Sequence, residues 1–149
     1  DAFPMCQLQA ATLCPQFETL PEMTEVRHRK ACGLIESTSS LDELVGLNQI
    51  VDETIPAYYK IPWLLKDRTP GWSRSELVNA LKAEGLPVGE GFRGFLRRSP
   101  RRCRKTGTLV NSQIASQQTI VLHHPVLLES ENTLELVAAA IHKVVTNSR

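Results

Sequence analysis

The sequence lacks the features that mark several classes of protein. Its four cysteines form no C-x-x-C pair, and no histidine stands at zinc-ligand spacing from them, so no metal site is predicted. It has no run of about eighteen apolar residues, so no membrane-spanning helix is expected. A chain of 149 residues can bury a core without disulfides, so we expect four reduced, mostly buried thiols at Cys6, Cys14, Cys32 and Cys103.

The first residues, DAFPMC, lack both an initiator methionine and the basic-then-apolar order of a signal peptide. The composition, 42% hydrophobic and 22% charged, is that of an ordinary globular chain. We therefore expect a cytoplasmic protein and an excised or processed piece of a longer chain.

Acidic residues are missing from one stretch of the chain. The segment from Arg93 to Lys105 carries seven of the 17 basic residues and none of the 16 acidic ones. The rest of the chain is therefore mildly acidic, although the formal net charge is only +1. The near-neutral total and the absence of interleaved aromatic residues argue against a dedicated nucleic-acid binder.

The stretch from Ile55 to Gly94 has the pattern of a strand, a helix and a second strand. Aromatic and branched residues between Tyr58 and Leu65 suit a half-buried strand. Ser73 and Glu76 form a capping box at the start of a helix, and Gly85 suits the left-handed position that ends it. A right-handed crossover would make the two strands parallel, with the helix on one face of the sheet.

The N-terminal third is predicted to form two helices, at residues 5–20 and 22–37. Pro15 removes a backbone donor, so we expect a break or kink near Cys14. Residues 41–47 are predicted to form a short helical turn.

The C-terminal third predicts a helix at residues 109–118, a strand at 119–123 and a final helix. Asn132 is the expected cap of that last helix, which carries an apolar stripe at helical spacing. Together these elements predict an α/β fold in which a small sheet is covered by helices.

Three stretches of the sequence together resemble one protein family. They are YYK…SRSELVNALKAEGLPVGEGFRGF in the centre, PMCQLQAATLCPQF near the start and IVLHHPVL near the end. Their order and content resemble the C-terminal small domain of the DegT-type aminotransferases. These are pyridoxal-phosphate enzymes of fold type I that mostly aminate nucleotide-linked keto-sugars.

In that family the Schiff-base lysine, the acidic partner of the pyridinium nitrogen and the main phosphate-binding loop lie in a larger upstream domain. Nothing in this sequence corresponds to that domain, so the resemblance implies no catalytic or cofactor-binding residue here. The family's Asn-x-Arg pair, which helps to bind the cofactor phosphate of the neighbouring subunit, is replaced by Ala2 and Pro4. Neither side chain can donate a hydrogen bond.

Candidate substrate contacts follow from the resemblance. Residues after the GEGF strand approach the bound nucleotide-sugar in the family, and arginine forks match phosphate groups. Phe92 stands where the family usually has a tyrosine. The substrate contacts predicted in this way are Glu90, Phe92, Arg93, Arg97, Arg98 and His123. The same basic segment is alternatively a solvated loop, which Ser99-Pro100 favours, or a nucleic-acid-binding arm.

The resemblance divides the chain into residues 1–50, the N-terminal helices at the domain junction, and residues 51–149, the α/β small domain. The implied function is the C-terminal portion of an aminotransferase of amino-sugar biosynthesis, which supplies substrate and subunit contacts. The expected partners are an anionic nucleotide-sugar and either a large domain or a second copy in a homodimer. An alternative function is a stand-alone, non-catalytic module that binds an anionic ligand or a protein partner.

Overall fold

A computed structural model describes residues 4–47, 54–66, 72–91, 94, 99, 101 and 104–147. The first elements are α1 (Gln7–Ser37), β1 (Leu44–Gly46), β2 (Lys60–Leu65), α2 (Arg74–Ala83) and β3 (Val88–Glu90). They are followed by α3 (Val110–Gln118), β4 (Thr119–His123), the 3-10 helix η2 (His124–Leu128) and α4 (Glu131–Thr146). Among these described residues, no helix is both long and apolar enough to cross a membrane.

The four strands form one sheet in the order β1-β2-β4-β3, and every neighbouring pair is antiparallel. β2 and β3 are therefore parallel to each other, as the strand-helix-strand pattern predicted. They are not neighbours, however, because β4 lies between them. The predicted α/β fold with a small, helix-covered sheet is confirmed.

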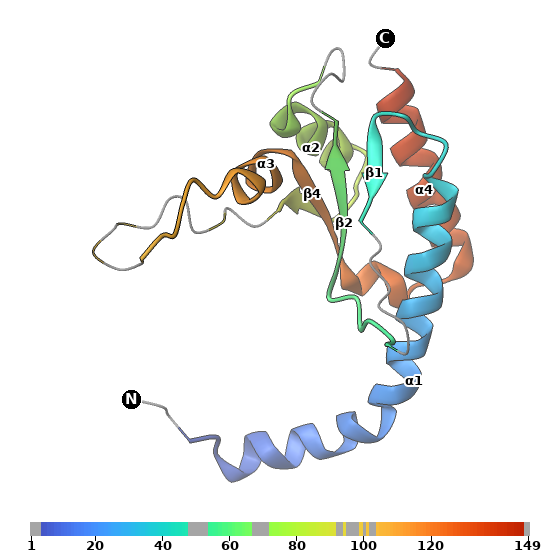
Figure 1. Cartoon of the computed structure of the whole chain (residues 1–149). Coiled ribbons are helices and arrows are strands. Elements are labelled where there is room, and N and C mark those ends of the chain that lie inside the picture. The colour runs from blue at the N-terminus through green and yellow to red at the C-terminus, as the bar shows by residue number, and fades with distance from the viewer. Residues whose placement is uncertain are drawn as a thin grey trace.

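The core lies on one face of the sheet, which α2, α4 and the second half of α1 cover (Figure 1). Trp63 at its centre is 2% exposed. Branched residues at helical spacing on α2 and α4 pack against alternate residues of the strands. The buried helix residues include Ala31, Leu34, Leu77, Val78, Leu81, Leu134, Val137, Ile141, Val144 and Val145.

Local signals fix both ends of α2. The Ser73 hydroxyl accepts from the Glu76 amide, and the Glu76 carboxylate accepts from the Ser73 amide at 2.8 Å. The hydrogen bonds from Ser73 hold the pKa of Glu76 below its ordinary value. Gly85 follows the helix with a φ of +86°, the left-handed conformation that favours glycine. The predicted capping box and helix end are both confirmed.

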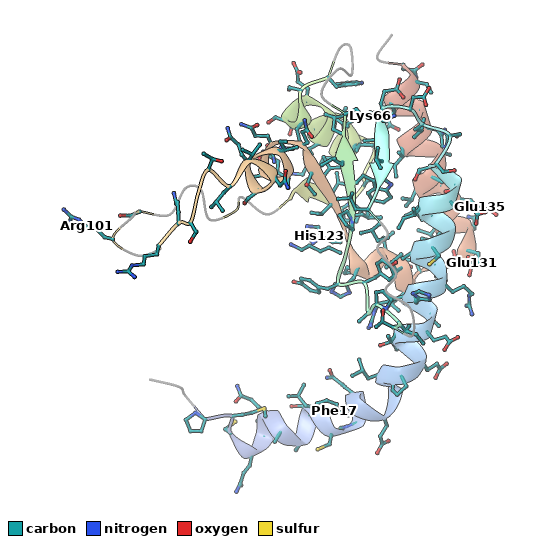
Figure 2. The ribbon with its side chains drawn as sticks, viewed as in Figure 1. Phe17, Lys66, Arg101, His123, Glu131 and Glu135 are labelled. Atoms are coloured by element: carbon teal, nitrogen blue, oxygen red, sulfur yellow. The ribbon has the colours of Figure 1, made fainter. Side chains whose placement is uncertain are left out.

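The predicted pair of N-terminal helices is wrong, because α1 runs without a break and holds both Pro15 and Pro21. Figure 1 shows instead that α1 bends between a lower and an upper limb. Phe17 lies on the lower limb (Figure 2). In a regular α-helix, the backbone amide of residue 21 would donate a hydrogen bond to the Phe17 carbonyl. Pro21 has no amide hydrogen, so the bend after Phe17 has a local cause.

Three smaller predictions are also corrected. Residues 44–46 form strand β1 instead of a helical turn, because they pair with β2 along its edge. α4 is capped by Ser130, whose hydroxyl accepts from the Thr133 amide at 3.2 Å, and not by Asn132. Cys6 and Cys14 are exposed because they lie at the start of α1, away from the core; Cys103 lies outside the described residues.

Candidate functional site

The second face of the sheet is only partly covered, and we call it the open face. Side chains alternate along β2, so Ile61, Trp63 and Leu65 are buried while the residues between them are exposed or half-buried. The pairing of the strands places Val45, Lys60, Pro62, Leu64, Thr119, Val121 and His123 together on the open face. This surface combines apolar side chains with a lysine and a histidine.

His123 and Glu90, two of the predicted substrate contacts, lie on opposite faces of the sheet. His123 pairs with Lys60 on the open face, on the side away from α4 (Figure 2). Glu90 pairs with Ile120, whose side chain is buried on the helix-covered face. The structure does not bring these two side chains into one site.

Glu90 is instead held by residues of α2. Its carboxylate accepts from the Arg74 guanidinium at 2.7 Å and from the Ser75 hydroxyl at 2.9 Å. Arg74 also donates to the Ser116 carbonyl of α3. This cluster joins α2, β3 and α3 at one end of the sheet. A carboxylate is also electrostatically favoured beside a helix N-terminus.

The other predicted contacts, Phe92, Arg93, Arg97 and Arg98, lie outside the described residues. Arg101, from the same basic segment, is exposed and lies far from the sheet (Figure 2). Gly91 precedes this segment, and a Cβ atom there would come within 2.8 Å of Thr119. Glycine is therefore required where the chain leaves β3 close to β4.

Sequence reasoning assigned no role to Arg74 beyond its place in the helix. One signal was present: a cation at the first position of a helix is disfavoured by the helix dipole unless an anion offsets it. The pairing with Glu90 could not be deduced, because 16 residues separate the two positions.

The lysines among the described residues do not provide a fitting site for pyridoxal phosphate. Only Lys30 is not exposed, and it lines a cavity of about 400 Å³ between α1 and α4. Its ammonium already contacts the Glu131 carboxylate at 3.8 Å and the Glu129 carbonyl. Glu131 and Glu135 also line this cavity (Figure 2), and two carboxylates would repel the cofactor phosphate.

Comparison with known proteins gives a consistent assignment. The model of the DegT/DnrJ/EryC1/StrS aminotransferase family matches residues 2–142. No curated protein matches the chain. The family uses pyridoxal phosphate.

Several solved structures share the fold. 3-Amino-5-hydroxybenzoic acid synthase is 26% identical with a TM-score of 0.75, over 93% of this chain and 38% of that one. PseC of Helicobacter pylori, an aminotransferase involved in the biosynthesis of pseudoaminic acid, is 13% identical with a TM-score of 0.81. The match covers 97% of this chain and 38% of PseC. DesI, solved in the presence of its TDP-sugar product, is 17% identical with a TM-score of 0.73. The match covers 89% of this chain and 34% of DesI.

This chain thus spans 34–38% of the length of the solved proteins that it resembles. The family match, in contrast, extends over residues 2–142 of its 149. On that evidence the chain belongs to the DegT/DnrJ/EryC1/StrS aminotransferase family.

Proposed function

We propose that this chain is the C-terminal small domain of a pyridoxal-phosphate-dependent sugar aminotransferase. In this role it supplies substrate and subunit contacts, while a larger domain supplies the catalytic lysine. The observation that carries the proposal is the combination of a family match over residues 2–142 with coverage of only 38% of a related synthase. Residues 51–149 would form the small domain proper, and residues 1–50 the junction with the larger one.

Two exposed apolar surfaces support this role. The lower limb of α1 presents Leu8 and Phe17, which are 76% and 66% exposed. The open face presents Val45, which is 40% exposed. Apolar surfaces of this kind mark contacts with another domain or subunit. A large domain or a second copy against them would remove both surfaces from water.

The proposed substrate is an anionic nucleotide-sugar, because DesI was solved with a TDP-sugar product. Arg93, Arg97 and Arg98 would bind its phosphates, and His123 and Phe92 would lie nearer to the sugar. Glu90, on the opposite face of the sheet from His123, would contribute indirectly. It would act by positioning Arg74 and Ser75, since its carboxylate is bonded to both.

The proposal is tested with two ligands added separately to the 149-residue chain. With pyridoxal phosphate, we expect no saturable internal-aldimine absorbance and no stoichiometric adduct on a single lysine in mass spectra after borohydride reduction. The described lysines are exposed, apart from Lys30, which is paired with Glu131, so excess cofactor would label them non-specifically and at partial occupancy. A stoichiometric adduct on one lysine would show that the chain has its own cofactor site and would overturn this assignment.

With a thymidine-diphosphate sugar, calorimetry is expected to show binding that weakens as salt is added. The double variant R97Q/R98Q should bind about tenfold more weakly or worse, because a hydrogen bond to a charged group contributes about 1.5 kcal/mol or more. Arg29→Gln, on α1, is the matched control and should bind like the wild type. Equal weakening by the control would refute a substrate role for the basic segment.

A further inference from the structure

A second cavity lies where the middle of α1, the segment before β2 and the start of η2 meet. It has a volume of about 200 Å³ and is lined by Arg27, Ala57, Tyr59 and His124. This is several times the roughly 30 Å³ that one water molecule occupies in the liquid. The cavity therefore has room for a small ligand group.

The backbone before β2 shapes this cavity. Tyr58 has a φ of +43°, an uncommon left-handed conformation for a residue other than glycine. Its side chain is buried, and its ring centroid lies 5.8 Å from that of His28. The pKa of its hydroxyl is raised, mainly by burial and further by the nearby Cys32. The next residue, Tyr59, stays exposed and covers His124, with ring centroids 5.1 Å apart.

Two polar atoms of the lining residues have no hydrogen-bond partner among the residues that the structure describes. The Nε of Arg27 and the Nδ1 of His124 are both buried, and neither has a hydrogen-bond partner in the part of the chain that the structure describes. Arg27 is always protonated, so its Nε can only donate. Buried donors without partners are rare in folded proteins, and each calls for a partner that completes it.

The described residues around the cavity carry charge of one sign. Among them, the lining holds an arginine and a histidine but no carboxylate. The Lys60 ammonium lies 5.5 Å from the Tyr59 ring centroid and adds positive charge at the edge. The larger cavity between α1 and α4 differs, because Glu131 and Glu135 line it.

We propose that the cavity of Arg27, Ala57, Tyr59 and His124 binds a small oxyanion, namely the phosphate or the carboxylate group of a ligand. An arginine fork matches either group with two parallel hydrogen bonds, and the His124 Nδ1 can donate a third. The inference does not depend on the proposed aminotransferase role, because it uses neither the basic segment nor any of the proposed substrate contacts.

The test is a nitrogen-15 NMR titration of the whole chain, which follows the side-chain nitrogens of Arg27 and His124. Sodium phosphate and sodium acetate are added in separate series, with sodium chloride keeping the ionic strength constant. We expect a saturable shift of both side chains. Saturation by phosphate alone assigns a phosphate group, and saturation by acetate assigns a carboxylate. No saturable shift in either series overturns the proposal.

Variants then locate the site. Arg27→Gln should weaken binding by about tenfold or more, which corresponds to about 1.4 kcal/mol. Arg29→Gln, two residues away on the same helix but outside this lining, should bind like the wild type. If the control weakens binding as much, the anion is attracted only by general charge and the proposal fails.

A third variant covers the case in which Arg27→Gln does not fold. His124→Phe keeps an aromatic ring against Tyr59 but removes both ring nitrogens, and Arg27 Nε still reports binding. Unchanged affinity in a folded His124→Phe protein would remove His124 from the site and contradict the proposal.

Discussion

At the scale of single residues, a threonine joins α1 to the centre of the sheet. Thr38 follows the last turn of α1 and is 2% exposed. Its hydroxyl donates to the Leu34 carbonyl at 3.0 Å and accepts from the Trp63 indole nitrogen at 3.1 Å. The largest side chain of the core therefore has its single polar atom satisfied by this hydroxyl.

Thr38→Val is expected to lower the free energy of unfolding by about 1–3 kcal/mol, because it leaves the buried Trp63 N–H without an acceptor. Urea unfolding measures this change. Thr12→Val is the matched control, since the Thr12 hydroxyl bonds to the Leu8 carbonyl at 2.8 Å on an exposed part of α1. The control should change stability by less than about 0.5 kcal/mol. Equal effects would mean that the bond to Trp63 contributes nothing.

At the scale of elements, α1 consists of two limbs with different roles. The upper limb packs against α4 and η2 and buries Ala31 and Leu34. The lower limb, before the bend, has apolar side chains that are largely exposed. A short isolated helical limb is marginal in water, so partner contacts are needed to stabilise it.

Leu34→Ala should destabilise the protein by about 2–5 kcal/mol, because it opens a cavity under the upper limb. Phe17→Ala removes a larger side chain but should change the free energy of unfolding by less than about 0.5 kcal/mol, since Phe17 is 66% exposed. Thermal unfolding of the two variants measures both effects. A large loss from Phe17→Ala would show that the lower limb packs against the body of the protein in solution.

At the scale of the whole molecule, two apolar surfaces lie on one chain. One is the lower limb of α1, which extends away from the sheet (Figure 1), and the other is the open face of the sheet, opposite the helix-covered face. A chain that carries two such surfaces can bury them against a second copy of itself. This association would be a property of the chain alone; in a whole enzyme the large domain would compete for the same surfaces.

The double variant L8E/F17E should therefore raise the concentration needed for self-association by about tenfold or more, because burying one such side chain contributes about 1.5–3 kcal/mol. Sedimentation velocity measures this change. Gln9→Glu with Gln16→Glu adds the same charge to the limb without removing apolar area and is the control. A wild-type chain that stays monomeric at high concentration would contradict the prediction.

Much of the candidate site could not be predicted from the sequence. Glu90 and His123 were grouped as substrate contacts because both lie in stretches that resemble the family, yet strand pairing sends their side chains to opposite faces. Arg27 and Tyr59 lie 32 positions apart in the sequence, and only folding brings them to one cavity. No local pattern specifies such distant pairs.

By itself, the sequence determined α2, β4, α4 and the family, because capping residues, apolar spacing and family sequence motifs are local properties of the chain. Only the tertiary structure decided that β4 lies between β2 and β3 and that residues 44–46 extend the sheet. These features depend on hydrogen bonds and packing between segments far apart in the chain. Their energy outweighs local preferences, which amount to about 1 kcal/mol for most residues and about 3 kcal/mol for proline.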